Sequence, residues 1–238
     1  MASQSGRLGV GIIGAGRVGP VVGAALAGAG HMIVGIASIS EDNRDRARAL
    51  LPDVPILEIP VLLERSELVI LAIPEAEIES LVAGLAATGS WHPGQLVLHT
   101  APGLGYTVLA PAVAAGVIPL AVHPTMVFTG TSLDLVRMRE SFFAVTAPTP
   151  VLPIGQALVV EMGGEPIIIA EADRAAYAEA VSTATNFSAS IVRQSTAMLA
   201  ELGIESAAQV LGPLLRSSVE TALQEAGGDS DLLRGMPD

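Results

Sequence analysis

The chain has 238 residues, of which 50% are hydrophobic and 15% are charged, so it predicts a compact protein with a large core rather than a disordered one. Its net charge of −12 argues against nucleic acid and anionic membrane surfaces as partners, because both recruit clustered cations. The chain contains neither cysteine nor lysine, which excludes disulfides, thiolate chemistry, Schiff bases and a lysine acid.

The first apolar segment, residues 8–13, leads directly into a glycine-rich turn. Gly14, Gly16 and Gly19 form a GxGxxG pattern that is followed by an alanine-rich segment. In such a turn the first glycine permits tight bending, the second admits a pyrophosphate, and the third allows close helix–strand packing. Glycine-rich strand–helix turns also occur without a nucleotide, but this context favours dinucleotide binding. We assign Arg17 and Val18 of the same turn to the cofactor site as well.

Strand and helix signals alternate along the following residues. Strands are expected at 8–13, 32–37, 68–73, 95–100, 117–123, 141–147 and 166–170. Helices are expected at 18–29, 42–51, 75–87 and 154–162. This alternation predicts an α/β domain over residues 6–170, built on a doubly wound, mostly parallel Rossmann sheet.

The pattern changes to long helical periodicity after Glu171. One expected helix presents an apolar face that includes Tyr177 and stops at Gly203. A second is expected to kink or restart at Gly212-Pro213 and to end at Gly227-Gly228. Residues 171–238 are therefore predicted to form a small all-helical domain that binds substrate and makes a homodimer.

The residues after the second expected strand bear on the identity of the cofactor. An acidic residue there usually binds the ribose 2′-hydroxyl of NAD. Here Ser38 and Ser40 are followed by Arg44, and hydroxyls and guanidinium groups suit a 2′-phosphate better. The sequence thus favours NADP over NAD. The alternative is that the arginines form a solvated helix face and that Glu41 contacts a ribose hydroxyl.

Three strand ends provide candidates for chemistry, because ligands of parallel sheets bind at the carboxyl ends of strands. We expect Ala72, Ile73, Pro74 and Thr100 to contact the cofactor, and His99 and His123 to act in catalysis. An imidazole there could exchange a proton with a carbonyl, hydroxyl or amine group. The alternative is that both histidines are structural hydrogen-bonding groups. No metal-ligand spacing and no GxSxG motif occurs.

The first tail helix carries a polar stripe of Thr183, Asn186, Ser190 and Arg193, spaced by three, four and three residues. This stripe could bind a carboxylate-bearing substrate, and we assign Asn186 a catalytic role. It could equally face solvent or a partner helix.

Several segments together resemble a known group of proteins. The Gly14–Gly19 turn, Leu71–Pro74, Phe142–Ala147, Asn186-Phe187 and above all Ala121–Gly130 resemble Rossmann-like proteins with a DUF2520 C-terminal domain. These are similar to 6-phosphogluconate dehydrogenase and pyrroline-5-carboxylate reductase. The resemblance implies an NADP-type cofactor and a helical homodimer, but no particular substrate. It also implies more helix after Arg234, as expected of a trimmed member or a fragment.

The leading functional hypothesis is an NADP-dependent oxidoreductase that moves hydride to or from a small metabolite. The absence of lysine departs from 6-phosphogluconate dehydrogenases, which use a lysine acid, so their chemistry is not carried over. One alternative is a non-catalytic NADP-binding regulatory protein. Another is a C=N (imine) reductase similar to pyrroline-5-carboxylate reductase. We expect a soluble, cytoplasmic protein, because no uninterrupted apolar stretch could span a bilayer.

Overall fold

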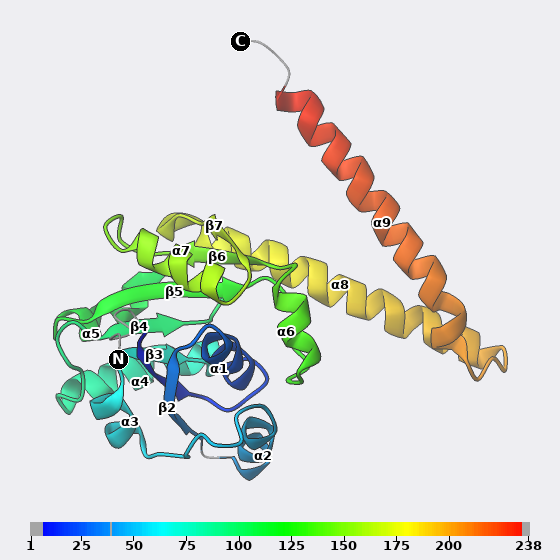
Figure 1. Ribbon diagram of the computed structural model, residues 1–238. Helices are drawn as coiled ribbons and strands as arrows, with labels where there is room; N and C mark the ends of the chain where they lie inside the picture. Colours follow the sequence, from blue (N-terminus) through cyan, green and yellow to red (C-terminus); the bar gives the residue numbers. More distant parts are fainter. Residues whose placement is uncertain (1–6, 39, 235–238) are drawn as a thin grey trace. The chain divides into compact units, whose positions relative to one another are not determined.

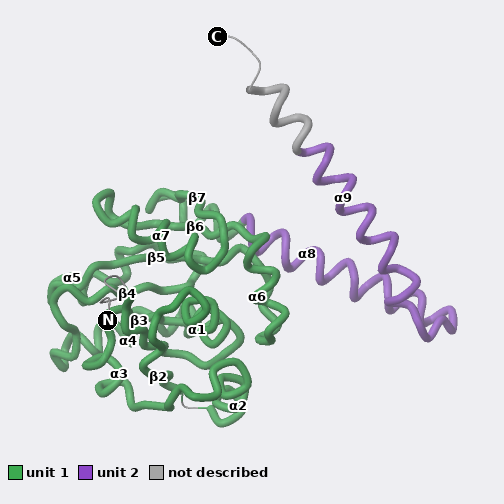
Figure 2. Tube along the Cα trace, viewed as in Figure 1, with its two compact units in different colours: residues 1–179 green, residues 180–238 purple. Residues whose placement is uncertain are grey.

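The computed structural model describes residues 7–38 and 40–234, with side chains described through residue 226 (Figure 1). The chain divides into two compact units, Met1–Glu179 and Ala180–Asp238, coloured separately in Figure 2. The first unit extends beyond residue 170 and includes the beginning of the long helix α8. Residue 6 and residues 235–238, the outer limits of the two expected domains, lie outside the described residues.

A seven-stranded sheet with the order β2-β1-β3-β4-β5-β6-β7 forms the centre of the first unit. Neighbouring strands are parallel except for β5 and β6, which are antiparallel. All seven strands expected from the sequence are present, which confirms the doubly wound, mostly parallel sheet. Their bounds are β1 Gly9–Ile13, β2 Met32–Ala37, β3 Leu68–Leu71, β4 Leu96–His99, β5 Ile118–Pro124, β6 Phe142–Thr146 and β7 Glu165–Ile168.

Helices connect these strands and cover both faces of the sheet. The four helices expected between strands are present, as α1 Gly19–Gly28, α2 Glu41–Leu50, α4 Glu75–Ala87 and α7 Leu152–Glu161. Shorter elements were not expected, because three to seven residues are too few to show a helical period. They are α3 Ile59–Arg65, α5 Ala110–Val113, α6 Leu133–Met138, and the 3₁₀ turns η1 Tyr106–Leu109 and η2 Glu171–Asp173.

Alternation along the strands places the core on both faces of the sheet. On β3, Leu68 and Ile70 pack in one buried cluster with side chains of α1 and α7. Val69 and Leu71 pack in a second cluster with side chains of α3 and α4. Successive strand side chains point to opposite faces, so a continuous apolar run is what a strand covered on both sides requires.

Two long helices follow, α8 Arg174–Glu201 and α9 Ala207–Arg234. Gly203 has a φ of 81°, which confirms the expected stop between them. The expected restart at Gly212-Pro213 is wrong, because α9 runs through Pro213 as one helix. The expected end at Gly227-Gly228 is also wrong, since α9 continues to Arg234. A glycine weakens a helix by only about 1 kcal/mol, so even two in succession need not end it. In the described part of the chain no helix has the length and apolarity to cross a membrane.

The glycine-rich turn is held by close backbone contacts between β1, β3 and α1. Gly14 has a φ of 110°, and a Cβ there would lie 2.2 Å from the carbonyl oxygen of Ala72. A Cβ on Gly19 would lie 2.1 Å from the carbonyl oxygen of Gly14. These positions must be glycine because backbone atoms cannot move aside as a side chain can.

We predict that Gly19→Ala lowers the free energy of unfolding by about 1–3 kcal/mol, as expected for overpacking against rigid backbone. Urea unfolding measures the effect. Gly16→Ala is the matched control, because a Cβ on Gly16 would meet no atom within 4 Å. A Gly19→Ala variant as stable as the Gly16→Ala variant would contradict this account of the turn.

Candidate functional site

The larger cavity at the sheet edge follows the glycine-rich turn and has a volume of about 760 Å³. It lies where β1, β2 and β3 end, which is the edge at which ligands of such sheets bind. Eight of the residues assigned to the cofactor from the sequence line it: Gly14, Gly16, Ser38, Ser40, Arg44, Ala72, Ile73 and Pro74.

The turn leaves room for a phosphate group. Gly16 lines the cavity, and the position of its absent Cβ is open space. The turn leads into α1, whose N-terminal amides and dipole favour an anion. The residues present therefore fit the pyrophosphate of a dinucleotide.

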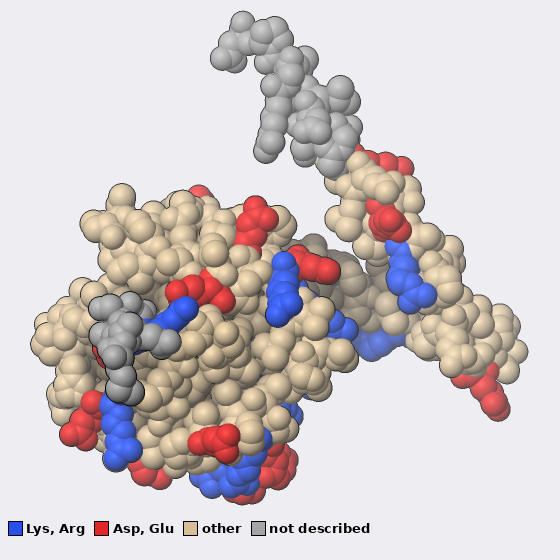
Figure 3. Space-filling model, viewed as in Figure 1, with Lys and Arg blue, Asp and Glu red and all other residues tan. Residues whose placement is uncertain are grey.

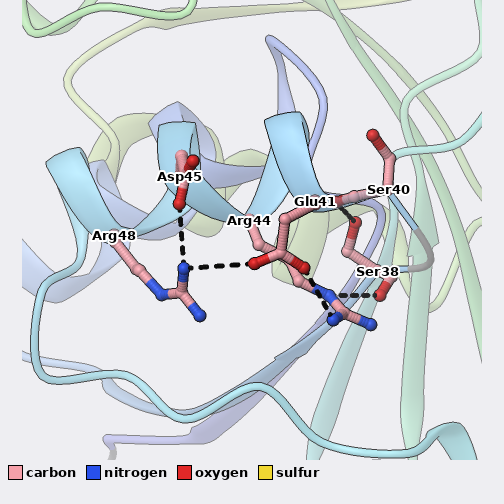
Figure 4. A network of polar contacts seen from close by, with 6 residues as sticks. All are labelled: Ser38, Ser40, Glu41, Arg44, Asp45 and Arg48. Carbon is pink, nitrogen blue, oxygen red and sulfur yellow. Dashed lines mark hydrogen bonds and ion pairs between the residues drawn. The ribbon is translucent and has the colours of Figure 1, made fainter.

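The other end of this cavity is polar, and Arg44 in its lining belongs to an ion-pair network on α2 (Figure 4). Arg44 donates from Nε to the Ser38 carbonyl at 3.0 Å and from Nη1 to Glu41 Oε2 at 3.0 Å. Arg48 Nη1 lies 3.5 Å from Glu41 Oε1 and 2.8 Å from Asp45 Oδ1. Both guanidinium groups therefore already face carboxylates.

A smaller cavity of about 390 Å³ adjoins the first, since Ala72 and Ile73 line both. Arg17, Val18 and Thr100, which were also assigned to the cofactor, lie here with His123. Pro124, Met126 and Phe128 provide apolar lining, and Glu75 provides a carboxylate. A cavity of this kind suits a small metabolite next to a redox ring.

His123 is held by the hydroxyl group of Tyr177, which in turn contacts that of Thr125. Its Nδ1 lies 2.8 Å from the Tyr177 hydroxyl, which lies 2.7 Å from Thr125 Oγ1. The rings of His123 and Tyr177 meet edge to face, with centroids 5.7 Å apart. Burial, reinforced by the Arg174 guanidinium and by His99, lowers the pKa of His123 to about 4, so the imidazole is neutral at pH 7. Burial also raises the pKa of Tyr177, against the effects of Thr125 and Arg174.

Arg174, the first residue of α8, lies next to Tyr177 and is 1% exposed. Within the described chain its hydrogen bonds all end on carbonyl or hydroxyl oxygens. The shortest are Nε to Thr146 Oγ1 at 2.7 Å, and Nη2 to the carbonyls of Ala121 at 2.8 Å and Ala144 at 3.1 Å. Its Cζ lies 5.9 Å from the centre of the Tyr177 ring. Burial lowers the pKa of Arg174 to about 10, so the group stays charged at pH 7.

His99 is fully buried and lines neither cavity. Its Nε2 donates to the Gly105 carbonyl at 2.9 Å, which leaves Nδ1 without a partner among the described residues. Burial lowers the pKa of His99 to about 4. Glu171 accepts hydrogen bonds from Tyr106 N and Thr107 N in the same loop. His99 therefore holds the loop after β4, and its catalytic role stays a prediction.

Asn186 lies on α8 in the second unit, where its exposed side chain donates to Ser182 Oγ at 2.8 Å. Gly19 lies beneath the turn and packs against Ile12 and Gly14. The first unit thus brings His123 together with the cofactor candidates. The role of Asn186 stays a prediction.

Two residues of this site were missed from the sequence. The helical period placed Tyr177 on an apolar face, and its need for a hydroxyl partner was the available signal. Arg174 bonds mainly to backbone carbonyls, which leave no trace in the sequence. Among the residues that the structure describes, no group of three or more His, Asp or Glu side chains could hold a metal ion.

Three solved structures illustrate the likeness of the fold. A candidate NADP oxidoreductase from Bacteroides fragilis is 17% identical with a TM-score of 0.74, over 90% of this chain and 80% of its own. An imine reductase from a Pseudomonas species is 13% identical, with a TM-score of 0.69 and coverages of 95% and 78%. A pyrroline carboxylate reductase from Plasmodium falciparum with NADP bound is 14% identical, with a TM-score of 0.58 and coverages of 97% and 80%. At these identities the likeness concerns the fold.

A search of curated proteins found no significant match. Family models match two parts of the chain. The Rossmann-like domain matches residues 2–124, and the domain of unknown function DUF2520 matches residues 141–233. The chain therefore belongs to the Rossmann-like domain family and carries a DUF2520 domain after its Rossmann-like domain.

Proposed function

We propose that this protein is an NADP-dependent oxidoreductase that transfers hydride to or from a small metabolite. The observation that carries the proposal is the pair of adjoining cavities, one along the glycine-rich turn and one containing His123. The first fits a dinucleotide, and the second has the size and mixed lining of a site for a small substrate. Similar folds occur in an imine reductase and in a pyrroline carboxylate reductase with NADP bound.

In this proposal Gly14 and Gly16 hold the pyrophosphate, and Ser38, Ser40 and Arg44 hold the adenosine ribose with its 2′-phosphate. The nicotinamide, when bound, supplies or accepts the hydride. Ala72, Ile73, Pro74 and Thr100 orient it, since they line the cavities at the ends of β3 and β4.

A proton must accompany the hydride when a carbonyl or imine is reduced. Because Nδ1 of His123 is engaged by Tyr177, Nε2 is the ring nitrogen left to meet the substrate. As Nε2–H gives its proton to the substrate, Nδ1 takes the proton of the Tyr177 hydroxyl, so the imidazole stays neutral overall. Thr125 and the Arg174 cation stabilise the phenolate that forms. His123 and Tyr177 together therefore take the place of the lysine acid that the chain lacks.

The geometry also supports reduction of a C=N bond as a second candidate. Glu75 lines the smaller cavity and gives it a carboxylate that would attract an iminium ion. A panel of carbonyl and imine substrates, scanned for oxidation of NADPH, distinguishes the two. Tight NADPH binding without turnover of any substrate would instead favour a regulatory protein.

We further propose that the second unit forms a homodimer. Large apolar side chains of α8 and α9 are exposed, among them Phe187 at 65% and Leu214 at 63%. Large apolar patches exposed on a protein surface usually mark a site of interaction with a partner.

We predict that Tyr177→Phe lowers kcat by about tenfold to a hundredfold, the range expected when one step of proton transfer is impaired. Steady-state oxidation of NADPH with the best substrate measures it. Tyr106→Phe removes the hydroxyl of the chain's other tyrosine, which lines neither cavity, and should leave kcat unchanged. Turnover that survives both Tyr177→Phe and His123→Ala unchanged would refute the relay.

The neutral histidines also predict how stability depends on pH. His99 and His123 stay unprotonated in the folded state down to about pH 4, whereas they bind protons near pH 6.5 when unfolded. The unfolded chain therefore binds more protons between about pH 4 and pH 6.5, and the free energy of unfolding falls as pH is lowered through that range. His123→Gln should reduce this slope by up to about 1 kcal/mol per pH unit in urea unfolding.

Light scattering should report a dimer, and a clean monomer at all concentrations would defeat the dimer proposal. Phe187→Glu should raise the dimer dissociation constant by about tenfold or more, because it places a charge in an apolar interface. Ala189→Glu adds the same charge to α8 on a different face and should change it much less.

A further inference from the structure

The ion-pair network on α2 has a consequence for the choice of cofactor. Among the side chains that the structure describes, Glu41 alone contacts both arginines, Arg44 at 3.0 Å through Oε2 and Arg48 at 3.5 Å through Oε1. Figure 4 shows its carboxylate between the two guanidinium groups. In Figure 3 acidic and basic side chains are intermingled over α2.

We propose that Glu41 is a specificity-determining residue that weakens the binding of NADP relative to NAD. This inference rests on the proposed function. A 2′-phosphate and the Glu41 carboxylate compete for the guanidinium group of Arg44, whereas a bare 2′-hydroxyl does not need it. The carboxylate thus acts as an internal substitute for the 2′-phosphate.

The position of Arg44 makes this competition direct. Arg44 lines the larger cavity, and its Nε is tied to the Ser38 carbonyl at 3.0 Å. Its guanidinium is therefore held at the ribose end of the cavity, where Nη1 faces Glu41. A phosphate at this guanidinium shares its positive charge with the Glu41 carboxylate, and one that takes the Nη1–H given to Glu41 displaces the carboxylate.

The remaining charges of the cavity act in the same direction. Its lining includes the carboxylates of Glu58 and Glu77 but only one cation, Arg44. A 2′-phosphate adds a charge of about −1.5 to −2, so it meets repulsion unless Arg44 is free to balance it. NAD adds no charge at this position and avoids the penalty.

The competition is mild, because the network is exposed. The side chain of Glu41 is 66% exposed and that of Arg48 is 53% exposed, so the carboxylate can turn toward water. Exposed ion pairs are individually weak and are screened by salt. Glu41 therefore biases the choice between the two cofactors without excluding NADP.

The test compares the dissociation constants of NADPH and NADH, measured by calorimetry at low salt, for the wild type, Glu41→Gln and Asp45→Asn. Asp45 is the matched control because it lies on the same helix, carries the same charge and contacts Arg48 at 2.8 Å. Glu41→Gln should tighten NADPH by about threefold to tenfold and change NADH by less than about twofold. Asp45→Asn should change either nucleotide by less than about twofold.

Adenosine 2′,5′-bisphosphate and AMP serve as second probes, since they differ only in the 2′-phosphate. Glu41→Gln should tighten the first alone, and the gain should disappear at high salt. An equal gain for both nucleotides, or one no larger than that of Asp45→Asn, would overturn this inference and leave the proposed function intact. Wild-type protein that binds neither NADPH nor NADH would overturn the proposed function, and with it this inference.

Discussion

The buried guanidinium of Arg174 joins the parts of the first unit on which the candidate site depends. It donates to the Ala121 carbonyl on β5 and the Ala144 carbonyl on β6, the pair at which the sheet changes from parallel to antiparallel. It also donates to Thr146 Oγ1, and so fixes the start of α8 on the sheet. A buried cation is tolerable only when its donors are satisfied, and here oxygens of β5, β6 and Pro102 accept its hydrogen bonds.

The same charge organises the chemistry of the cavity. Burial favours the neutral forms of His99 and His123, and the nearby Arg174 cation acts in the same direction. For Tyr177 the cation favours the phenolate, while burial opposes it. A neutral imidazole between a substrate and a tyrosine can pass a proton without itself becoming charged. In the proposed relay a site without lysine delivers its proton from the phenol of Tyr177, which replaces the ammonium group as the source.

The sequence predicted the sheet well and the site in part, for physical reasons. Strands such as Leu68–Leu71 are buried on both faces, so their uninterrupted apolar runs identify them. His123 was predicted because it lies at a strand end, where a parallel sheet binds its ligands; it does line the smaller cavity, and its catalytic role stays a prediction. Tyr177 was interpreted as a core residue, because helical spacing reports which face a side chain occupies but not what its hydroxyl bonds. Arg174 could not be recognised, since Ala121 and Ala144 contribute only backbone carbonyls to it.

Residue types alone do not decide whether the cofactor is NAD or NADP. Ser38, Ser40 and Arg44 suit a 2′-phosphate by their chemistry, yet in the folded chain Arg44 already bonds a carbonyl and a carboxylate. What a phosphate gains there is the difference between its own contacts and those it displaces. That difference depends on Glu41, which lies three residues before Arg44 and so one turn away on the same face of α2. The three-residue spacing that lets Glu41 stabilise α2 through Arg44 therefore also weakens the affinity of Arg44 for a phosphate. The charge on one exposed residue is enough to shift the balance between two cofactors that differ by one phosphate group.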